Sequence, residues 1–272
     1  MFLRNITRIL DQETQKLIQE AVRNPNPSSK AIIHLALKDR PLTPAALKES
    51  ADQLRTFIFA GFDTTSTTLQ WAFYYLSLPQ NAATFEALCA EHDQLLGPVD
   101  NKDAIEAFLR TDPVMPYTTA VIKESLRMEP PAATARWVPP SHKPFYLAGP
   151  DGTQHCVNGT PIYINHRIIF QSTKFWGPDA KTFRPERWLD KEYVANLPVG
   201  VFRPFERGPR GCIGQELTMM EAKVVLALTA RRFTFKKWTP PEEVSDLGDV
   251  WNVYSITATP NDAMRMTIKK RC

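Results

Sequence analysis

The chain has 272 residues, of which 43% are hydrophobic, and its formal net charge is +4. A charge this small, without a long basic run or a basic patch interleaved with aromatic residues, gives little support to nucleic-acid binding. The four cysteines have no CxxC spacing and follow no secretory leader, so we expect reduced thiols in a cytosolic setting. No window of the sequence is apolar enough to predict a transmembrane helix.

The first half of the chain is predicted to be helical. Thr43 can cap a long helix that has Pro44 at its first position and meets no further proline before Pro79. Apolar residues recur at helical spacing along it. The same spacing and the usual stop signals predict further helices over residues 9–22, 29–37, 82–96, 103–109 and 117–128.

The second half of the chain is predicted to contain short strands and irregular segments as well as one long helix. Alternating apolar residues, glycines and prolines predict short strands and turns over residues 135–165, with PIYIN the clearest strand. We expect an irregular stretch over residues 171–204, a helix over 213–232, and two strands over 251–258 and 264–269 joined by the turn TPND. The predicted fold class is therefore mainly α with small β-sheets (α+β).

One stretch of the long helix is unusual. IFAGFDTTSTT, residues 58–68, places Gly61, Asp63 and a run of hydroxyl residues in an otherwise apolar helix, although these are weak helix formers. The hydroxyl of Thr64 can bond to a carbonyl of the preceding turn and loosen the helix locally. For the four hydroxyl residues at 65–68 we prefer ordinary helix packing.

A glycine-rich loop, FERGPRGCIGQ, precedes the last long helix. Its glycines at 208, 211 and 214 allow the backbone to turn tightly and to approach a flat object closely. Cys212 lies just before the predicted helix, where backbone amides favour a thiolate, and thiolates bind iron. For a cysteine in isolation, a buried structural residue would be the simpler interpretation.

The pattern Phe205-x-x-Gly208-x-Arg210-x-Cys212-x-Gly214 resembles the haem-binding signature of the cytochromes P450 at every fixed position. Three further segments resemble motifs of this family, in the family's order. AGFDTT at 60–65 is similar to the motif of the distal helix, ESLR at 124–127 to the ExxR motif, and FRPERW at 183–188 to the PERF motif. The residues around the distal-helix motif and the cysteine loop are most similar to those of the eukaryotic microsomal branch of the family.

This resemblance implies a site built around haem b. Cys212 would be the axial thiolate ligand of the iron, and the other cofactor-binding residues would be Arg136, Phe205, Arg210 and Gly214. Phe205 would shield the thiolate, and the two arginines would contact haem propionates. Glu124, Arg127 and Arg187 would form a buried ion-pair network that holds the cysteine loop against the helices.

The resemblance also implies catalytic roles on the long helix. Thr64 would orient dioxygen and water, and Asp63 would relay protons for cleavage of the O–O bond. Residues 131–135 and the turn at 260–262 would line the substrate pocket. We expect His166 to have a structural role, because the family has a similar His-Arg pair there with a packing function.

The function implied is that of a haem-thiolate monooxygenase. It would insert one atom of O2 into an apolar small-molecule substrate, with electrons from NADPH through NADPH-cytochrome P450 reductase or a similar donor. The sequences around the distal-helix motif and the cysteine loop also resemble those of enzymes of fungal secondary metabolism.

The resemblance covers only the C-terminal part of the family fold, so we expect residues 1–272 to form a single partial domain. The family's N-terminal half supplies a membrane anchor at the cytoplasmic face of the endoplasmic reticulum. A chain without that anchor is expected to be soluble in the cytoplasm.

Two alternatives remain open from the sequence. The first is a non-catalytic remnant of the family with weak or no haem binding, because the absent half would contribute propionate partners and the lid over the substrate. The second is a haem-thiolate isomerase or dehydratase that needs no reductase. The intact Asp63–Thr64 pair argues against the second alternative, because that chemistry does not require protonation of dioxygen.

Overall fold

The structure is a computed structural model that describes residues 2–26, 28–29, 31–39, 41–99, 102–111, 114–238 and 250–271. The chain forms two compact units, residues 1–63 and 64–272, and it passes from one to the other within helix α3 (Pro44–Ser77). Helix α3 is α-helical along its whole length, including residues 58–68. Within the described residues no helix is both long and apolar enough to cross a membrane.

The first unit contains α1 (Phe2–Arg23), α2 (Ile32–Leu37) and the beginning of α3. The predicted cap of α3 is confirmed, because the Thr43 hydroxyl accepts a hydrogen bond from the Ala46 amide at 3.2 Å. An ion pair between Asp11 and Arg55 joins α1 to α3. Among the residues whose burial is described, the buried side chains of this unit come from the same two helices: Thr14, Ile18, Ala21, Ser50 and Ala51.

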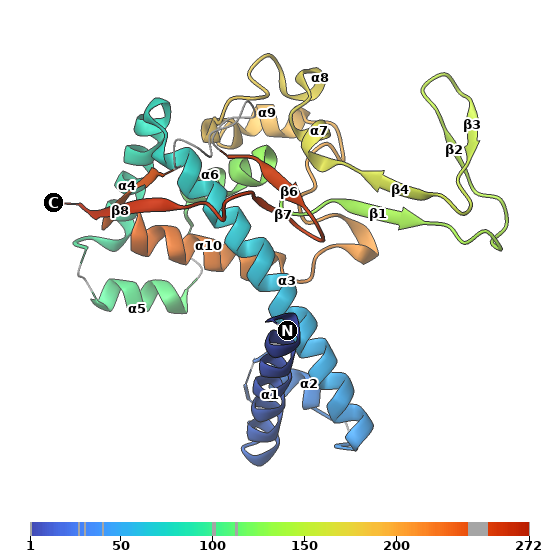
Figure 1. Ribbon diagram of the computed structural model, residues 1–272. Coiled ribbons are helices and arrows are strands. Elements are labelled where there is room, and N and C mark those ends of the chain that lie inside the picture. The colour runs from blue at the N-terminus through green and yellow to red at the C-terminus, as the bar shows by residue number, and fades with distance from the viewer. Residues whose placement is uncertain are drawn as a thin grey trace. The chain divides into compact units, whose positions relative to one another are not determined.

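The second unit is organised around four long helical segments (Figure 1). These are the remainder of α3, which a short turn η1 (Pro79–Asn81) links to α4 (Ala82–Leu96), then α6 (Pro116–Met128) and α10 (Gln215–Thr229). The peripheral helix α5 (Lys102–Arg110) lies between α4 and α6 in sequence. The predicted helices are confirmed, although α10 begins two residues later than expected. The largest apolar cluster draws on all four helical segments, including Leu76, Leu88, Val121, Ile122, Ala222 and Leu226.

Helix α6 is fixed at its N-terminus by a carboxylate from α4. Glu91 accepts hydrogen bonds from the backbone amides of Tyr117 and Thr118, at 2.7 and 2.8 Å, so it satisfies two donors that a helix start leaves unpaired. The next residue, His92, is fully buried and bonds to the Thr118 hydroxyl at 2.8 Å. Burial lowers the pKa of His92 to about 4, so this histidine is neutral at physiological pH.

Within the described part of the chain, the strands form four separate antiparallel pairs. They are β1 (Thr134–Trp137) with β4 (Pro161–Ile164), β2 (Tyr146–Ala148) with β3 (Gln154–Cys156), β5 (Phe233–Lys237) with β8 (Met266–Lys270), and β6 (Asn252–Tyr254) with β7 (Ala258–Pro260). PIYIN contains β4, as predicted. The fold class, mainly α with small β-sheets, is confirmed.

Two regions differ from the sequence prediction. The stretch expected to be irregular is punctuated by short helices: after α7 (His166–Phe170) come α8 (Thr173–Trp176), η2 (Pro185–Trp188) and α9 (Lys191–Asn196). In the tail, the strand expected over 251–258 folds back on itself as the β6–β7 hairpin, and the TPND segment lies partly in β7. Strand β5 was not predicted. Elements of three to six residues are too short to show a clear hydrophobic period, so the sequence pattern does not reveal them.

Candidate functional site

The cysteine loop is closed by its own backbone. The Cys212 amide donates a hydrogen bond to the Phe205 carbonyl at 2.8 Å, and the Gly211 amide donates to the Gly208 carbonyl at 2.9 Å. Between them lies a single 3-10 turn, η3 (Gly208–Arg210). Gly208 has φ of +74°, a conformation that strongly favours glycine. The Cys212 side chain is exposed, three residues before the first residue of α10.

The glycines of the loop have different roles. A Cβ at Gly211 would lie 3.2 Å from the Gly208 carbonyl oxygen, so a side chain there would press on the turn. A Cβ at Gly214 would lie 3.8 Å from the Cys212 sulfur, which is ordinary van der Waals contact. Gly214 precedes the first residue of α10 and keeps the surroundings of the sulfur open. An exposed soft sulfur ligand on a tightly closed loop fits an iron centre.

Glu206 attaches this loop to the β1–β4 pair. Its carboxylate accepts a hydrogen bond from the Thr134 hydroxyl at the start of β1, and it lies 3.1 Å from Nε2 of His166. Arg203 is 3.9 Å away from the same carboxylate. Partial burial raises the pKa of Glu206, but the hydrogen bond from Thr134 and the positive charge of Arg203 outweigh it and leave the pKa below its ordinary value.

His166 has the structural contacts that the sequence suggested. Its Nδ1 lies 3.2 Å from the Ala132 carbonyl, and its ring stacks on Phe170 with ring centres 5.2 Å apart. Together with the contact to Glu206, these interactions join the cysteine loop, the segment before β1 and helix α7.

Glu124, Arg127 and Arg187 meet in the interior with fully buried side chains. Arg127 binds the Glu124 carboxylate with two nitrogens, at 2.8 and 2.9 Å, and Arg187 Nε contacts the same carboxylate at 3.1 Å. The Trp188 indole and the Arg184 backbone amide also donate to this carboxylate, each at 2.9 Å. One carboxylate from α6 therefore accepts hydrogen bonds from three residues of the FRPERW segment.

The two arginines extend this network to the segment that follows α7. Arg127 donates to the carbonyls of Phe170, Ala180 and Thr182, at 2.7, 2.5 and 3.1 Å. Arg187 contacts Asp179 at 3.3 Å. Among the contacts described for the three side chains, none reaches the cysteine loop, so what the network holds directly against α6 is residues 170–188. This differs from the expected arrangement, because the loop is attached instead through Glu206, at a position that the signature leaves unspecified.

The remaining predicted cofactor residues lie within the cysteine loop or on β1. Phe205 is half-buried and packs against the main apolar cluster. Arg210 is exposed at the end of the 3-10 turn. Arg136 is exposed on β1 and donates to the neighbouring Ala135 carbonyl at 2.9 Å. The predicted contacts of both arginines with haem propionates stay predictions.

Helix α3 contacts α10 close to the cysteine loop. The hydroxyls of Thr65 and Thr218 lie 3.4 Å apart in the interior, and the Thr68 hydroxyl donates to the Thr64 carbonyl at 2.9 Å. Thr64 is therefore in the turn of α3 that packs on the beginning of α10. Asp63 is the last residue of the other compact unit, so its role in proton relay stays a prediction from the sequence.

The structure connects the segment at 131–135, predicted to line a substrate pocket, to strand β7, whose last residue, Pro260, begins the other predicted segment. The Ala258 amide of β7 donates to the Pro131 carbonyl at 2.8 Å. Behind this contact, buried Glu129 binds Arg167 at 2.9 and 3.0 Å and Asn252 of β6 at 2.5 Å. The β6–β7 hairpin is thereby tied to the end of α6.

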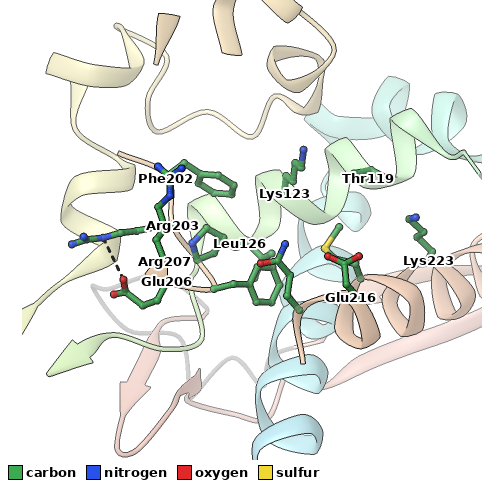
Figure 2. A pocket seen from close by; sticks show the side chains of 13 residues that line it. Thr119, Lys123, Leu126, Phe202, Arg203, Glu206, Arg207, Glu216 and Lys223 are labelled. Atoms are coloured by element: carbon green, nitrogen blue, oxygen red, sulfur yellow. Dashed lines mark ion pairs between the residues drawn. The ribbon is translucent and has the colours of Figure 1, made fainter. Parts of the chain in front are cut away.

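A cavity of about 480 Å³ opens beside the cysteine loop, between α6, residues 202–207 and α10. Figure 2 shows Lys123 and Lys223 on one side of it and the ion pair of Arg203 with Glu206 on the other. Its lining includes the apolar side chains of Leu126, Phe202 and Phe205. Sequence reasoning singled out Phe205 alone among these residues.

Comparison with known proteins identifies the family. Residues 2–252 match the family model described as Cytochrome P450, so the chain belongs to the cytochrome P450 family. It is similar to the cytochrome P450 monooxygenase acrF of Aspergillus aculeatus, at 32% identity over 253 residues, which are 80% of this chain and 50% of the relative. It is also similar to a bifunctional cytochrome P450/NADPH–P450 reductase of Aspergillus oryzae, at 29% identity over 245 residues, 88% of this chain and 21% of the relative.

A crystal structure of a cytochrome P450, CYP102L1, has the same fold. The TM-score is 0.72 at 22% sequence identity, and the match covers 97% of this chain and 56% of that chain. The chain spans about half the length of acrF and about a fifth of the length of the bifunctional relative. The resemblance inferred from the four motifs is confirmed, and family membership implies a haem iron with a thiolate ligand.

The buried network yields a stability prediction. Replacing Arg127 with Met leaves three carbonyls and part of the Glu124 carboxylate without their donors, so we expect the free energy of unfolding to fall by about 3–5 kcal/mol. Urea denaturation followed by circular dichroism measures this loss.

Arg110→Met is the matched control, because Arg110 forms an exposed pair with Glu106 at 3.8 Å in the same unit. We expect this change to stay within about 0.5 kcal/mol. If Arg127→Met does not fold, Arg127→Lys should still be clearly destabilised, since one ammonium cannot replace the guanidinium fork. Equal effects of Arg127→Met and Arg110→Met would contradict the prediction.

The Glu206 anchor yields a pH prediction. A carboxylate whose pKa lies below its ordinary value of 4.5 stabilises the fold above that pH, and this contribution is lost as the pH falls through the lowered value. We expect Glu206→Gln to be less stable than the unmodified chain by about 1 kcal/mol at neutral pH, and the difference to vanish in acid. Glu221→Gln, at an exposed position of α10, should show no such pH-dependent difference.

Proposed function

We propose that this chain is the haem-binding part of a haem-thiolate monooxygenase that inserts one atom of O2 into an apolar organic substrate. The observation that carries the proposal is the exposed sulfur of Cys212 on a loop closed by the Phe205 carbonyl. The name of the acrF relative as a monooxygenase supports the same activity. A role in fungal secondary metabolism accords with the fungal source of both relatives reported above.

The cysteine loop would hold the haem through its own residues. Cys212 would ligate the iron, and the hydrogen bond from its backbone amide to the Phe205 carbonyl would keep the sulfur in place. Gly214 would leave room for the macrocycle beside the sulfur, and Arg136 and Arg210 would pair with the propionates. When bound, the haem supplies dioxygen activation, with electron density pushed from the thiolate.

Two residues of α3 would supply protons for the reaction. The Thr64 hydroxyl would hold a water molecule and pass its proton on, and Asp63 would replenish that proton from solvent. Residues 131–135 and 260–262 would border the apolar substrate.

The electrons would come from NADPH through a cytochrome P450 reductase or a similar donor. The relative from Aspergillus oryzae carries both activities in its name, which supports such a partner. A haem-thiolate isomerase or dehydratase would turn over without it. For the whole protein we propose the cytoplasmic face of the endoplasmic reticulum, from the resemblance to microsomal members.

Haem ligation by Cys212 is testable on this chain. After reconstitution with haem, reduction and addition of CO, we expect the red-shifted Soret band that marks a thiolate ligand. Cys212→Ser should lose that band, whereas Cys156→Ser, at the other exposed cysteine among the described residues, should keep it. Circular dichroism of both variants checks that they remain folded.

The stoichiometry of haem to protein separates this proposal from the alternative of a remnant without haem. A chain that binds no haem, or a Cys212→Ser variant with an unchanged CO spectrum, would overturn the ligand assignment. For the haem-loaded chain, oxidation of an apolar substrate that depends on NADPH and added reductase is the outcome expected of a monooxygenase. Turnover without either would favour an isomerase or dehydratase.

A further inference from the structure

A second cavity lies in the unit of residues 64–272, and none of its lining residues belongs to the candidate haem site. It measures about 680 Å³ and is bordered by α4, the turn that follows α10 and the end of β8. Figure 1 shows the end of β8 beside α4. Four cationic side chains line this cavity, and Asp93 is the one carboxylate among its described lining residues; the cations are Arg231, Arg232, Lys270 and Arg271.

Arg231 is the deepest of these cations. Its side chain is 3% exposed, and Nη1 contacts the Asp93 carboxylate at 3.2 Å and the Gly97 carbonyl at 2.5 Å. Its Nε is buried and has no hydrogen-bond partner among the described residues. A buried guanidinium donor without an acceptor is costly, so an acceptor brought into the cavity would relieve this cost.

The other cations are held at the border of the cavity by separate elements. Arg232 donates to the Val99 carbonyl at 2.8 Å. Arg271 contacts the Cys89 sulfur at 3.3 Å and pairs with Glu86 of α4 at 3.1 Å. Lys270 is exposed at the end of β8, opposite Phe233 in the β5–β8 register. Two segments that are distant in sequence, the turn after α10 and the end of β8, thus present positive charge to one cavity.

We propose that this cavity binds a small anion through a phosphate group. Guanidinium forks match the spacing of phosphate oxygens, and an ammonium adds a point charge. The volume lies within the range of small-molecule sites. The anion would join the α10–β5 turn to the end of β8, so binding should stabilise the folded chain. This inference does not depend on the proposed haem chemistry.

Pyrophosphate is the probe for this site. We expect it to raise the midpoint of thermal unfolding in a saturable way at constant ionic strength, and to bind the chain in isothermal titration calorimetry. Lys270→Gln should weaken binding by about tenfold, the usual size for the loss of one charged contact. Arg232→Gln should weaken it as well, which provides a second and independent variant.

Lys269→Gln is the matched control. Lys269 is also exposed, lies in the same strand and is absent from the cavity lining, since successive strand residues point to opposite faces. We expect this variant to bind pyrophosphate like the unmodified chain. The proposal is overturned if sodium chloride at equal ionic strength gives the same stabilisation, or if Lys269→Gln weakens binding as much as Lys270→Gln.

A further arm distinguishes the two sources of a phosphate group. Vesicles of phosphatidylcholine, with and without phosphatidylinositol 4-phosphate, are mixed with the chain and sedimented. Binding to the phosphorylated vesicles alone, competed by pyrophosphate and weakened by Lys270→Gln, would identify a lipid headgroup as the source. Pyrophosphate binding without vesicle binding would identify a free phosphate compound.

Discussion

The carboxylate of Glu124 is the interaction on which the second unit depends most. It is fully buried, and it accepts hydrogen bonds from two arginine side chains, an indole and a backbone amide. An ionised carboxylate in such a place is tolerated only because its donors are complete. Burial lowers the pKa of Arg187, but the negative charges of Glu124 and Asp179 and the contact with Tyr193 together outweigh it and leave the pKa above its ordinary value. The long segment after α7 therefore has a defined path across α6, although it contains few regular elements of its own.

The cysteine loop is held by contacts that are separate from the Glu124 network. Glu206 ties it to β1 and to His166, and the Phe205 carbonyl closes it around Cys212. His166 belongs to α7. The carbonyl of Phe170, the last residue of α7, accepts a hydrogen bond from Arg127. The loop and the buried network are thus linked through one short helix. The Cys212 side chain is exposed on a loop whose backbone is closed by hydrogen bonds.

Sequence patterns predicted the long elements well and the short ones poorly. Helices α4 and α6 have enough turns for an apolar period, and Gly97 and the prolines mark their ends. Strand β5 pairs with β8, which is distant in sequence, and the strands of the β6–β7 hairpin have only three residues each, so no local period reveals them. Within the site, the motifs named Glu124, Arg127 and Cys212. They did not name Glu206 or Glu91, because those residues occupy positions where a motif or a helix pattern allows any residue.

The sequence by itself determined the family, the helical frame and the sulfur at position 212, because all three depend on local periodicity or on residues at fixed spacing. Tertiary structure alone decided which carboxylate anchors the loop, where the Glu124 network sends its donors, and that Arg231, Arg232 and Lys270 line one cavity. These features join side chains that lie tens or hundreds of residues apart. Their energies come from burial and complete hydrogen bonding, and neither can be read until the chain has folded.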